Sequence, residues 1–134
     1  MEFSSQLFYN PNSIFFNRMK NILKIEELAQ FLLGIVLFSQ LDFAWWWFPS
    51  LILLPDIGMI GYAFNTKVGA FVYNLFHNKA VGIALILIGM FYFGEIFTLI
   101  GIILFSHSAM DRIFGYGLKY PDSFQNTHLG KIGK

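Results

Sequence analysis

The sequence contains no cysteine, and charged residues make up only 13% of its 134 positions. The lack of cysteine excludes disulfide bonds and thiol catalysis, but it leaves the cellular compartment open. The scarcity of charge excludes a disordered chain and a coiled coil, because both are rich in charged side chains. Nine basic and eight acidic residues give a net charge of +1, so no attraction to nucleic acid is expected.

Hydrophobic residues are what the chain has in excess. They make up 56% of the sequence, aromatic residues make up 19%, and the mean hydropathy is +0.57. A chain of this length forms one small domain, and a small domain leaves much of its surface exposed. So few polar residues cannot cover that surface in water, whereas lipid accommodates an apolar exterior. The composition therefore predicts an integral membrane protein.

Four segments are apolar and long enough to cross a bilayer, which requires about 20 residues for each helix. They cover residues 25–41, 43–64, 68–93 and 96–114. The links between them are short, and short links make successive helices antiparallel neighbours. We therefore expect an all-α membrane protein, an up-down four-helix transmembrane bundle over residues 25–114.

Two polar segments, residues 1–24 and 115–134, flank the predicted bundle. Residues 13–24 mix apolar and basic side chains, which predicts a short N-terminal interfacial helix, with a frayed basic leader as the alternative. The first long apolar run begins only after about two dozen residues, so a cleaved signal peptide is not expected. The C-terminal tail is rich in glycine and is expected in the cytoplasm.

Basic residues predict the orientation, because Lys and Arg near the ends of spans remain in the cytoplasm. They cluster before the first span, between the second and third spans, and after the fourth. The other side carries only Asp42 and Glu95, and the segment 45–47 is Trp-Trp-Trp, which is typical of an outer interface. We therefore predict a multi-pass protein of the cytoplasmic membrane with both termini inside and membrane lipids as its partners.

Four ionisable residues lie inside the predicted spans, where such side chains are costly and usually functional. They are Asp56, His77, His107 and Asp111. At a rise of about 1.5 Å per residue, all four fall in one layer of the cytoplasmic half. His107 and Asp111 are four residues apart and therefore share a helix face. Pro55 is expected to kink the helix beside Asp56, and such breaks at membrane depth line cavities.

Two histidines and two aspartates form a suitable ligand set for Zn²⁺ or a similar divalent ion. The same groups could also act as acids and bases around a bound water. The first hypothesis is therefore a membrane-embedded hydrolase or transferase acting on a lipid-linked substrate from the cytoplasmic leaflet. The alternatives are a small transporter or accessory subunit with a proton or ion relay, and a structural network of interhelical hydrogen bonds. Lys79 weakens the metal hypothesis if its charge shares the cavity with His77.

Further residues are expected to support this site. They are Glu26, Tyr73, Asn74, Arg112, Tyr116, Lys119 and His128. Glu26 and Asn74 would orient the four ionisable residues, and Arg112 could form a plain ion pair with Asp111. A glycine-rich turn at residues 115–117 would fold the tail back under the bundle, so that Tyr116, Lys119 and His128 cap the cavity. Lys119 could instead meet an anionic lipid headgroup, and a solvated tail is the other alternative.

Four motifs carry a resemblance to a known family. They read LPDIGMIGY at residues 54–62, VGAFVYNLFH at 68–77, HSAMDRIFGYGLKYP at 107–121 and THLGKIG at 127–133. Together they resemble the small bacterial four-span integral membrane proteins of domain of unknown function 4260, over residues 25–133. Glu26 matches the acidic residue at the start of that family's first span. The resemblance implies a bacterial membrane location but no activity, and it leaves substrate, metal identity and a homo-oligomeric state open.

Overall fold

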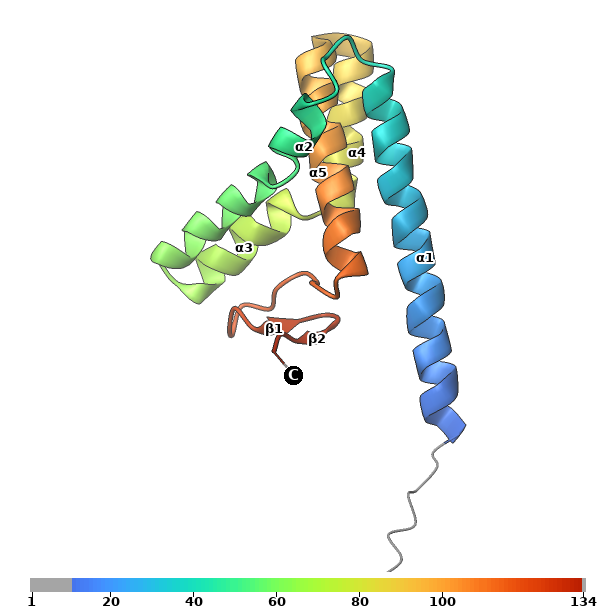
Figure 1. Ribbon diagram of the computed structural model, residues 1–134. Helices are drawn as coiled ribbons and strands as arrows, with labels where there is room; N and C mark the ends of the chain where they lie inside the picture. The colour runs from blue at the N-terminus through green and yellow to red at the C-terminus, as the bar shows by residue number, and fades with distance from the viewer. Residues whose placement is uncertain (1–10, 134) are drawn as a thin grey trace, which may run out of the picture.

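The computed structural model describes residues 11–133, and nearly all of its regular structure is helical (Figure 1). The helical segments are α1 Pro11–Ser39, α2 Trp47–Leu51, the 3₁₀ helix η1 Leu54–Ala63, α3 Thr66–Phe76, α4 Lys79–Ile88, the π-helical turn η2 Gly89–Phe93 and α5 Glu95–Ile113. Two short strands, β1 Asn126–Thr127 and β2 Gly130–Lys131, pair antiparallel in the tail. The predicted all-α class is thus confirmed, with one small hairpin added.

Helix α5 is the centre of the molecule, and α1 and α4 pack along it (Figure 1). Gly94 has a φ of +91°, which favours glycine and lets the chain reverse from η2 into α5. Buried apolar side chains from α1, α2, α4 and α5 form the core, and Phe38, Phe48, Ile86 and Ile102 are among them. This core fixes the position of α5, which carries two of the predicted site residues.

A second unit, formed by η1 and α3, projects from this core at an angle (Figure 1). Asn65 caps α3 by accepting a hydrogen bond from the Val68 amide at 2.8 Å. Helix α3 ends at Phe76, and Asn78 caps α4 by accepting from the Ala80 amide at 2.8 Å. The resulting bend of 48° between α3 and α4 places His77 at the junction of the two units.

The four-span bundle is not confirmed. Within residues 11–133, α5 alone is long and apolar enough to cross a membrane, or two spans exist if α3 and α4 with η2 count as one bent span. The predicted span over residues 43–64 is divided into α2 and η1, because Pro55, Gly58 and Gly61 are poor α-helix formers. The predicted boundary at residue 24 falls within the continuous helix α1, and residues 1–10 of the predicted interfacial segment lie outside the described residues.

The C-terminal tail folds back against α3. The Asn74 side chain donates to the Lys119 carbonyl at 2.9 Å and accepts from the Lys119 amide at 2.7 Å. The backbone on the other side of Lys119 pairs antiparallel with Thr127, so the tail backbone is held on both sides. The tail therefore lies beside the end of α5 rather than being freely solvated.

Candidate metal centre

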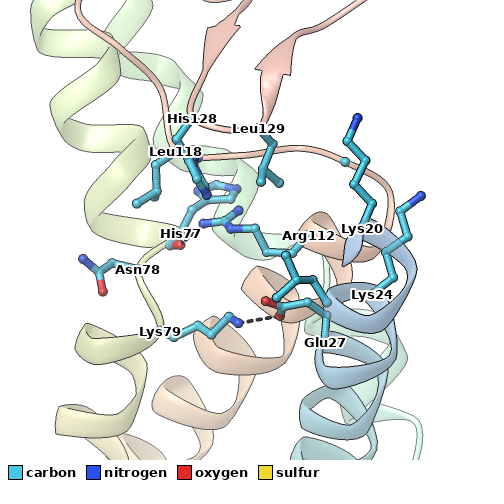
Figure 2. Close-up of a pocket in the computed structure, with 12 residues that line it drawn as sticks. Lys20, Lys24, Glu27, His77, Asn78, Lys79, Arg112, Leu118, His128 and Leu129 are labelled. Carbon is cyan, nitrogen blue, oxygen red and sulfur yellow. Dashed lines mark hydrogen bonds and ion pairs between the residues drawn. The ribbon is translucent and has the colours of Figure 1, made fainter. Parts of the chain in front are cut away.

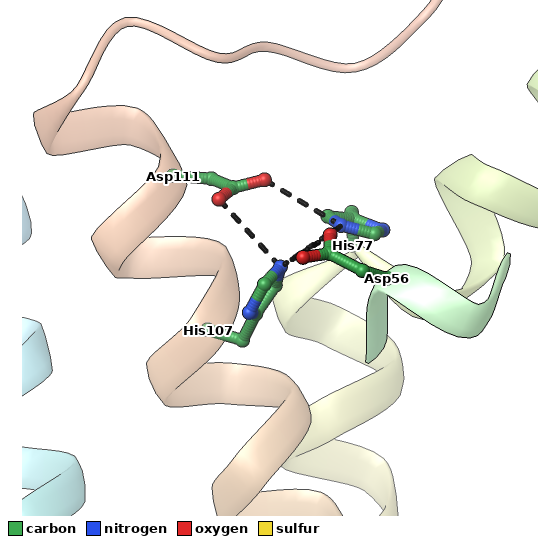
Figure 3. Close-up of side chains that lie close together, drawn as sticks. All are labelled: Asp56, His77, His107 and Asp111. Atoms are coloured by element: carbon green, nitrogen blue, oxygen red, sulfur yellow. Dashed lines mark hydrogen bonds and ion pairs between the residues drawn. The ribbon is translucent and has the colours of Figure 1, made fainter. Parts of the chain in front are cut away.

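Four side chains from three segments converge at the junction of the two units (Figure 3). Asp56 comes from η1, His77 from the α3–α4 junction, and His107 and Asp111 from successive turns of α5. Each side chain offers one ligand atom, and the four atoms lie within 4.8 Å of one another. The bend at residues 77–78 and the 3₁₀ turn at Asp56 are thus the local features that assemble the group.

The distances between the histidine nitrogens and the carboxylate oxygens are close to those of a tetrahedral ion site. The two Nε2 atoms of His77 and His107 are 3.0 Å apart, and each lies 3.3 Å from Oδ1 of Asp56. The Asp111 carboxylate lies 3.5 Å from the His77 Nε2 atom and 3.6 Å from the His107 Nε2 atom, through different oxygens. A tetrahedral Zn²⁺ with bonds of about 2.0–2.1 Å has ligand–ligand separations of about 3.3–3.4 Å. The side chains therefore need only small adjustments to surround an ion.

The second ring nitrogen of each histidine fixes the tautomer. Nδ1 of His77 lies 2.8 Å from the Tyr73 carbonyl oxygen, and Nδ1 of His107 lies 2.6 Å from the Ile52 carbonyl oxygen. A carbonyl oxygen only accepts, so both Nδ1 atoms donate, and in the neutral rings both Nε2 atoms carry lone pairs. Two lone pairs that face each other require a proton or a cation between them. Histidine ligands of metals commonly donate their other N–H to a backbone carbonyl in this way.

The group is closed on most sides. The side chains of His77 and His107 are 0% and 1% exposed, Asp111 is 11% exposed, and Asp56 is 39% exposed. Solvent or a substrate therefore reaches the centre at Asp56. An apolar groove of about 210 Å³ lies beside this opening, between η1, α3 and α5, and the neighbours of Asp56 in the chain, Pro55 and Ile57, line it.

Tyr73 supports two of the four side chains at once. Its hydroxyl donates to Oδ2 of Asp111 at 3.1 Å, and its ring stacks on the imidazole of His77 with centroids 3.7 Å apart. Arg112 does not form the predicted ion pair with Asp111; its guanidinium instead donates to the carbonyls of His77 at 3.0 Å and Tyr116 at 2.7 Å. Arg112 thereby holds the backbone of the His77 junction.

The remaining supporting residues are farther from the centre. Asn74 holds the tail, as described above, and Tyr116 is 44% exposed. Lys119 is buried, and its ammonium lies over the rings of Tyr73 and Phe124 at 4.9 and 3.9 Å. Burial lowers the pKa of Lys119, and the negative charge of Asp111 opposes that shift. Lys119 is therefore enclosed by the fold and does not extend outward toward a headgroup.

The acidic residue of α1 that forms an ion pair with another helix is Glu27, not the predicted Glu26. Glu26 is exposed, whereas Glu27 forms an ion pair with Lys79, which also donates to Gln30 at 2.8 Å. The charge of Lys79 is thus neutralised by α1, which removes the objection that it would repel a cation near His77. Glu27 and Gln30 are three residues apart on one face of a helix, and that spacing was the available signal in the sequence.

The predicted family is confirmed by comparison with known proteins. No curated protein and no solved structure matches the chain. A family model described as "Domain of unknown function (DUF4260)" matches residues 20–132, so the chain belongs to that family.

Proposed function

We propose that this protein is a membrane-embedded, metal-dependent hydrolase in which His77, His107 and Asp111 hold a divalent ion such as Zn²⁺ and Asp56 faces the open position of that ion. The observation that carries the proposal is the pair of Nε2 atoms 3.0 Å apart, each with its Nδ1 committed to a carbonyl. A cation bound by both lone pairs removes their repulsion, and the two aspartates balance its charge.

Three of the four residues are buried, and the fourth, Asp56, lies on the open side of the centre. His77, His107 and Asp111 are the buried ligands, and three protein ligands with one open position are typical of catalytic zinc. A bound Zn²⁺ lowers the pKa of a coordinated water to about 7. Asp56, on the open side, accepts a proton from the attacking water and returns it to the leaving group. The reaction is therefore hydrolysis at an electrophilic carbonyl or phosphoryl centre, with water as the second substrate.

The apolar groove beside Asp56 supports a substrate with a lipid chain. Its lining is entirely apolar, and residues from η1, α3 and α5 contribute to it, including Leu54, Phe76 and Leu104. Burial of a hydrocarbon chain there would stabilise binding by about 0.8 kcal/mol for each methylene. A chain held in the groove places its polar end next to the opening at Asp56.

An apolar exterior supports the membrane location. Large side chains such as Tyr92, Phe64 and Phe91 are 83%, 79% and 71% exposed. Exposed apolar surface on this scale is typical of proteins in contact with lipid or with partners. The N-terminal part of α1 and the tail lie at one end of the molecule, and the turn after η2 lies at the other (Figure 1). We therefore infer a bacterial cytoplasmic membrane protein with both termini inside.

One alternative function rests on the same pair of histidines. A shared proton between the two Nε2 atoms also removes the repulsion, and a chain from Asp56 through the histidines to Asp111 and Tyr73 would then form a proton relay. A relay needs no metal. The response of the protein to a chelator therefore separates the two functions.

The test is a thermal unfolding series on the purified protein in detergent, with and without a chelator. A bound ion stabilises only the folded form, so we expect the chelator to lower the Tm of the wild type. Asp56→Asn should retain the metal-dependent Tm but lose hydrolysis of a lipid-linked ester, because the amide cannot accept the proton. An unchanged Tm with chelator would contradict the metal-dependent hydrolase and favour the relay.

A further inference from the structure

A second cavity of about 610 Å³ lies on the tail side of the molecule, between α1, the α3–α4 junction and the tail (Figure 2). His77 lies between this cavity and the metal centre, since it lines the cavity and its backbone carbonyl accepts from Arg112 there, while its ring nitrogen Nε2 lies beside His107 in the metal centre. The cavity is therefore a distinct site, which the proposed hydrolysis does not use.

The charges that line this cavity are mostly positive. Lys20, Lys24, Lys79 and Arg112 contribute four positive charges, and Glu27 contributes one negative charge. Glu27 is paired with Lys79, so these two charges cancel. Among residues 11–133, no carboxylate lies within ion-pair distance of Lys20, Lys24 or Arg112, whose charges are therefore available to an anion.

Hydrogen-bond donors in the cavity remain unused. A guanidinium has five N–H donors, and the backbone contacts of Arg112 with His77 and Tyr116 use two of them. His128 accepts a hydrogen bond from the Leu118 amide through Nδ1 at 2.8 Å, so its neutral ring carries the hydrogen on Nε2. Figure 2 shows Arg112 near His128, while Lys20 and Lys24 come from the α1 wall. The donors of Arg112 and His128 thus lie together on the tail side of the cavity, whereas the side chains of Lys20 and Lys24 line its α1 wall and extend outward in Figure 2, away from Arg112.

We propose that this cavity binds a phosphate group. A phosphate offers several acceptor oxygens and a negative charge, which match the guanidinium fork of Arg112 and the two lysines of α1. Leu23, Leu118 and Leu129 supply apolar surface in the same cavity. The phosphate can therefore belong to a lipid headgroup, whose glycerol end contacts the leucines, or to free phosphate.

The experiment compares two probes on the full-length protein in nonionic detergent, by calorimetry with EDTA present. The probes are inorganic phosphate and dihexanoyl phosphatidic acid. EDTA removes any ion from the metal centre, so phosphate bound to a metal does not contribute. If the proposed metal centre is wrong, this test of phosphate binding is still valid. If phosphate does not bind, the proposed metal centre is unaffected.

The variants change only exposed lysines, so the fold is preserved. Lys20→Gln with Lys24→Gln removes two charges from the cavity, and Lys67→Gln with Lys131→Gln removes two exposed charges outside its lining. We expect the first pair to weaken phosphate binding roughly tenfold or more, and the control pair less than about twofold. Stronger binding of phosphatidic acid identifies a lipid headgroup, and equal binding of both probes identifies free phosphate as sufficient. An equal loss of phosphate affinity in both double variants, or no binding of either probe to the wild type, would overturn the proposal.

Discussion

Tyr73 contacts both a carboxylate and a histidine of the metal centre, because its hydroxyl donates to Asp111 and its ring stacks on His77. Tyr73→Phe removes the hydroxyl and keeps the stacked ring. We expect the affinity for Zn²⁺ to fall about 10-fold or more, as is usual when a hydrogen bond to a ligand is lost. Competition with a chromophoric chelator measures this affinity. Tyr116→Phe, at an exposed position, should leave the affinity for Zn²⁺ unchanged, and equal losses of affinity in both variants would contradict the role of Tyr73.

His128 gives the tail a pH dependence. Partial burial lowers its pKa from the ordinary value of 6.5, and the positive charge of Arg112 lowers it further. The unfolded chain then binds a proton more readily than the folded protein, so the stabilisation is present above pH 6.5 and is lost as the pH falls below it. The Tm of the wild type, measured with chelator between about pH 7.5 and 5.5, should therefore fall more steeply than that of His128→Gln. Parallel curves for the two proteins would contradict this explanation.

The candidate site was predictable at the level of single residues because polar side chains are rare in this sequence. Asp56, His77, His107 and Asp111 stand out against apolar neighbours, and the structure brings all four together. The pairing of Lys79 with Glu27 was not predictable, since it depends on how α1 packs beside α4. Exposed Glu26 shows the limit of the sequence, because neighbouring positions on a helix point about 100° apart.

At the scale of elements, α4 and α5 approach each other through two glycines. A Cβ atom on Gly101 would lie 2.5 Å from the Ile86 amide nitrogen and 2.6 Å from the Gly82 carbonyl oxygen. Backbone atoms cannot move aside, so Gly101→Ala should separate the helices and lower the free energy of unfolding by about 1–3 kcal/mol. Thermal or denaturant unfolding measures the effect. Ile96→Ala, at an exposed position of α5, is the control, and a Gly101→Ala protein as stable as that control would contradict this packing.

The elements were predictable where the apolar run is continuous and contains few helix breakers. Helix α5 follows the predicted span closely, and most of the first predicted span lies in α1. The break between α3 and α4 was missed because the apolar residues on both sides add up to the length of one span, although His77, Asn78 and Lys79 interrupt the apolar run and Asn78 is a strong N-cap residue. The division of residues 43–64 was predicted only in part: a kink was expected at Pro55, but the mean composition of the segment still predicts one span, and the 3₁₀ helix that follows Pro55 was not expected.

At the scale of the whole molecule, the exposed apolar surface predicts that the protein remains with the membrane. Fusions of a reporter at residue 134 and at Asp42 test the orientation. We expect a cytoplasmic signal at residue 134 and a periplasmic signal at Asp42. Basic residues lie near the predicted span ends on the side of residue 134, and none lies near the span ends on the side of Asp42. Recovery of the protein in the soluble fraction without detergent would contradict the membrane location.

The metal content of the purified protein tests the central claim most directly. Elemental analysis should find about one divalent ion for each wild-type chain. His107→Ala should lose it, because the remaining ligands no longer enclose the ion. His128→Ala is the matched control, since its ring lies in the tail and contacts the Leu118 amide, and it should keep the ion. A wild-type protein without metal, even after incubation with Zn²⁺, or a His107→Ala variant with the same content as His128→Ala, would contradict the proposed centre.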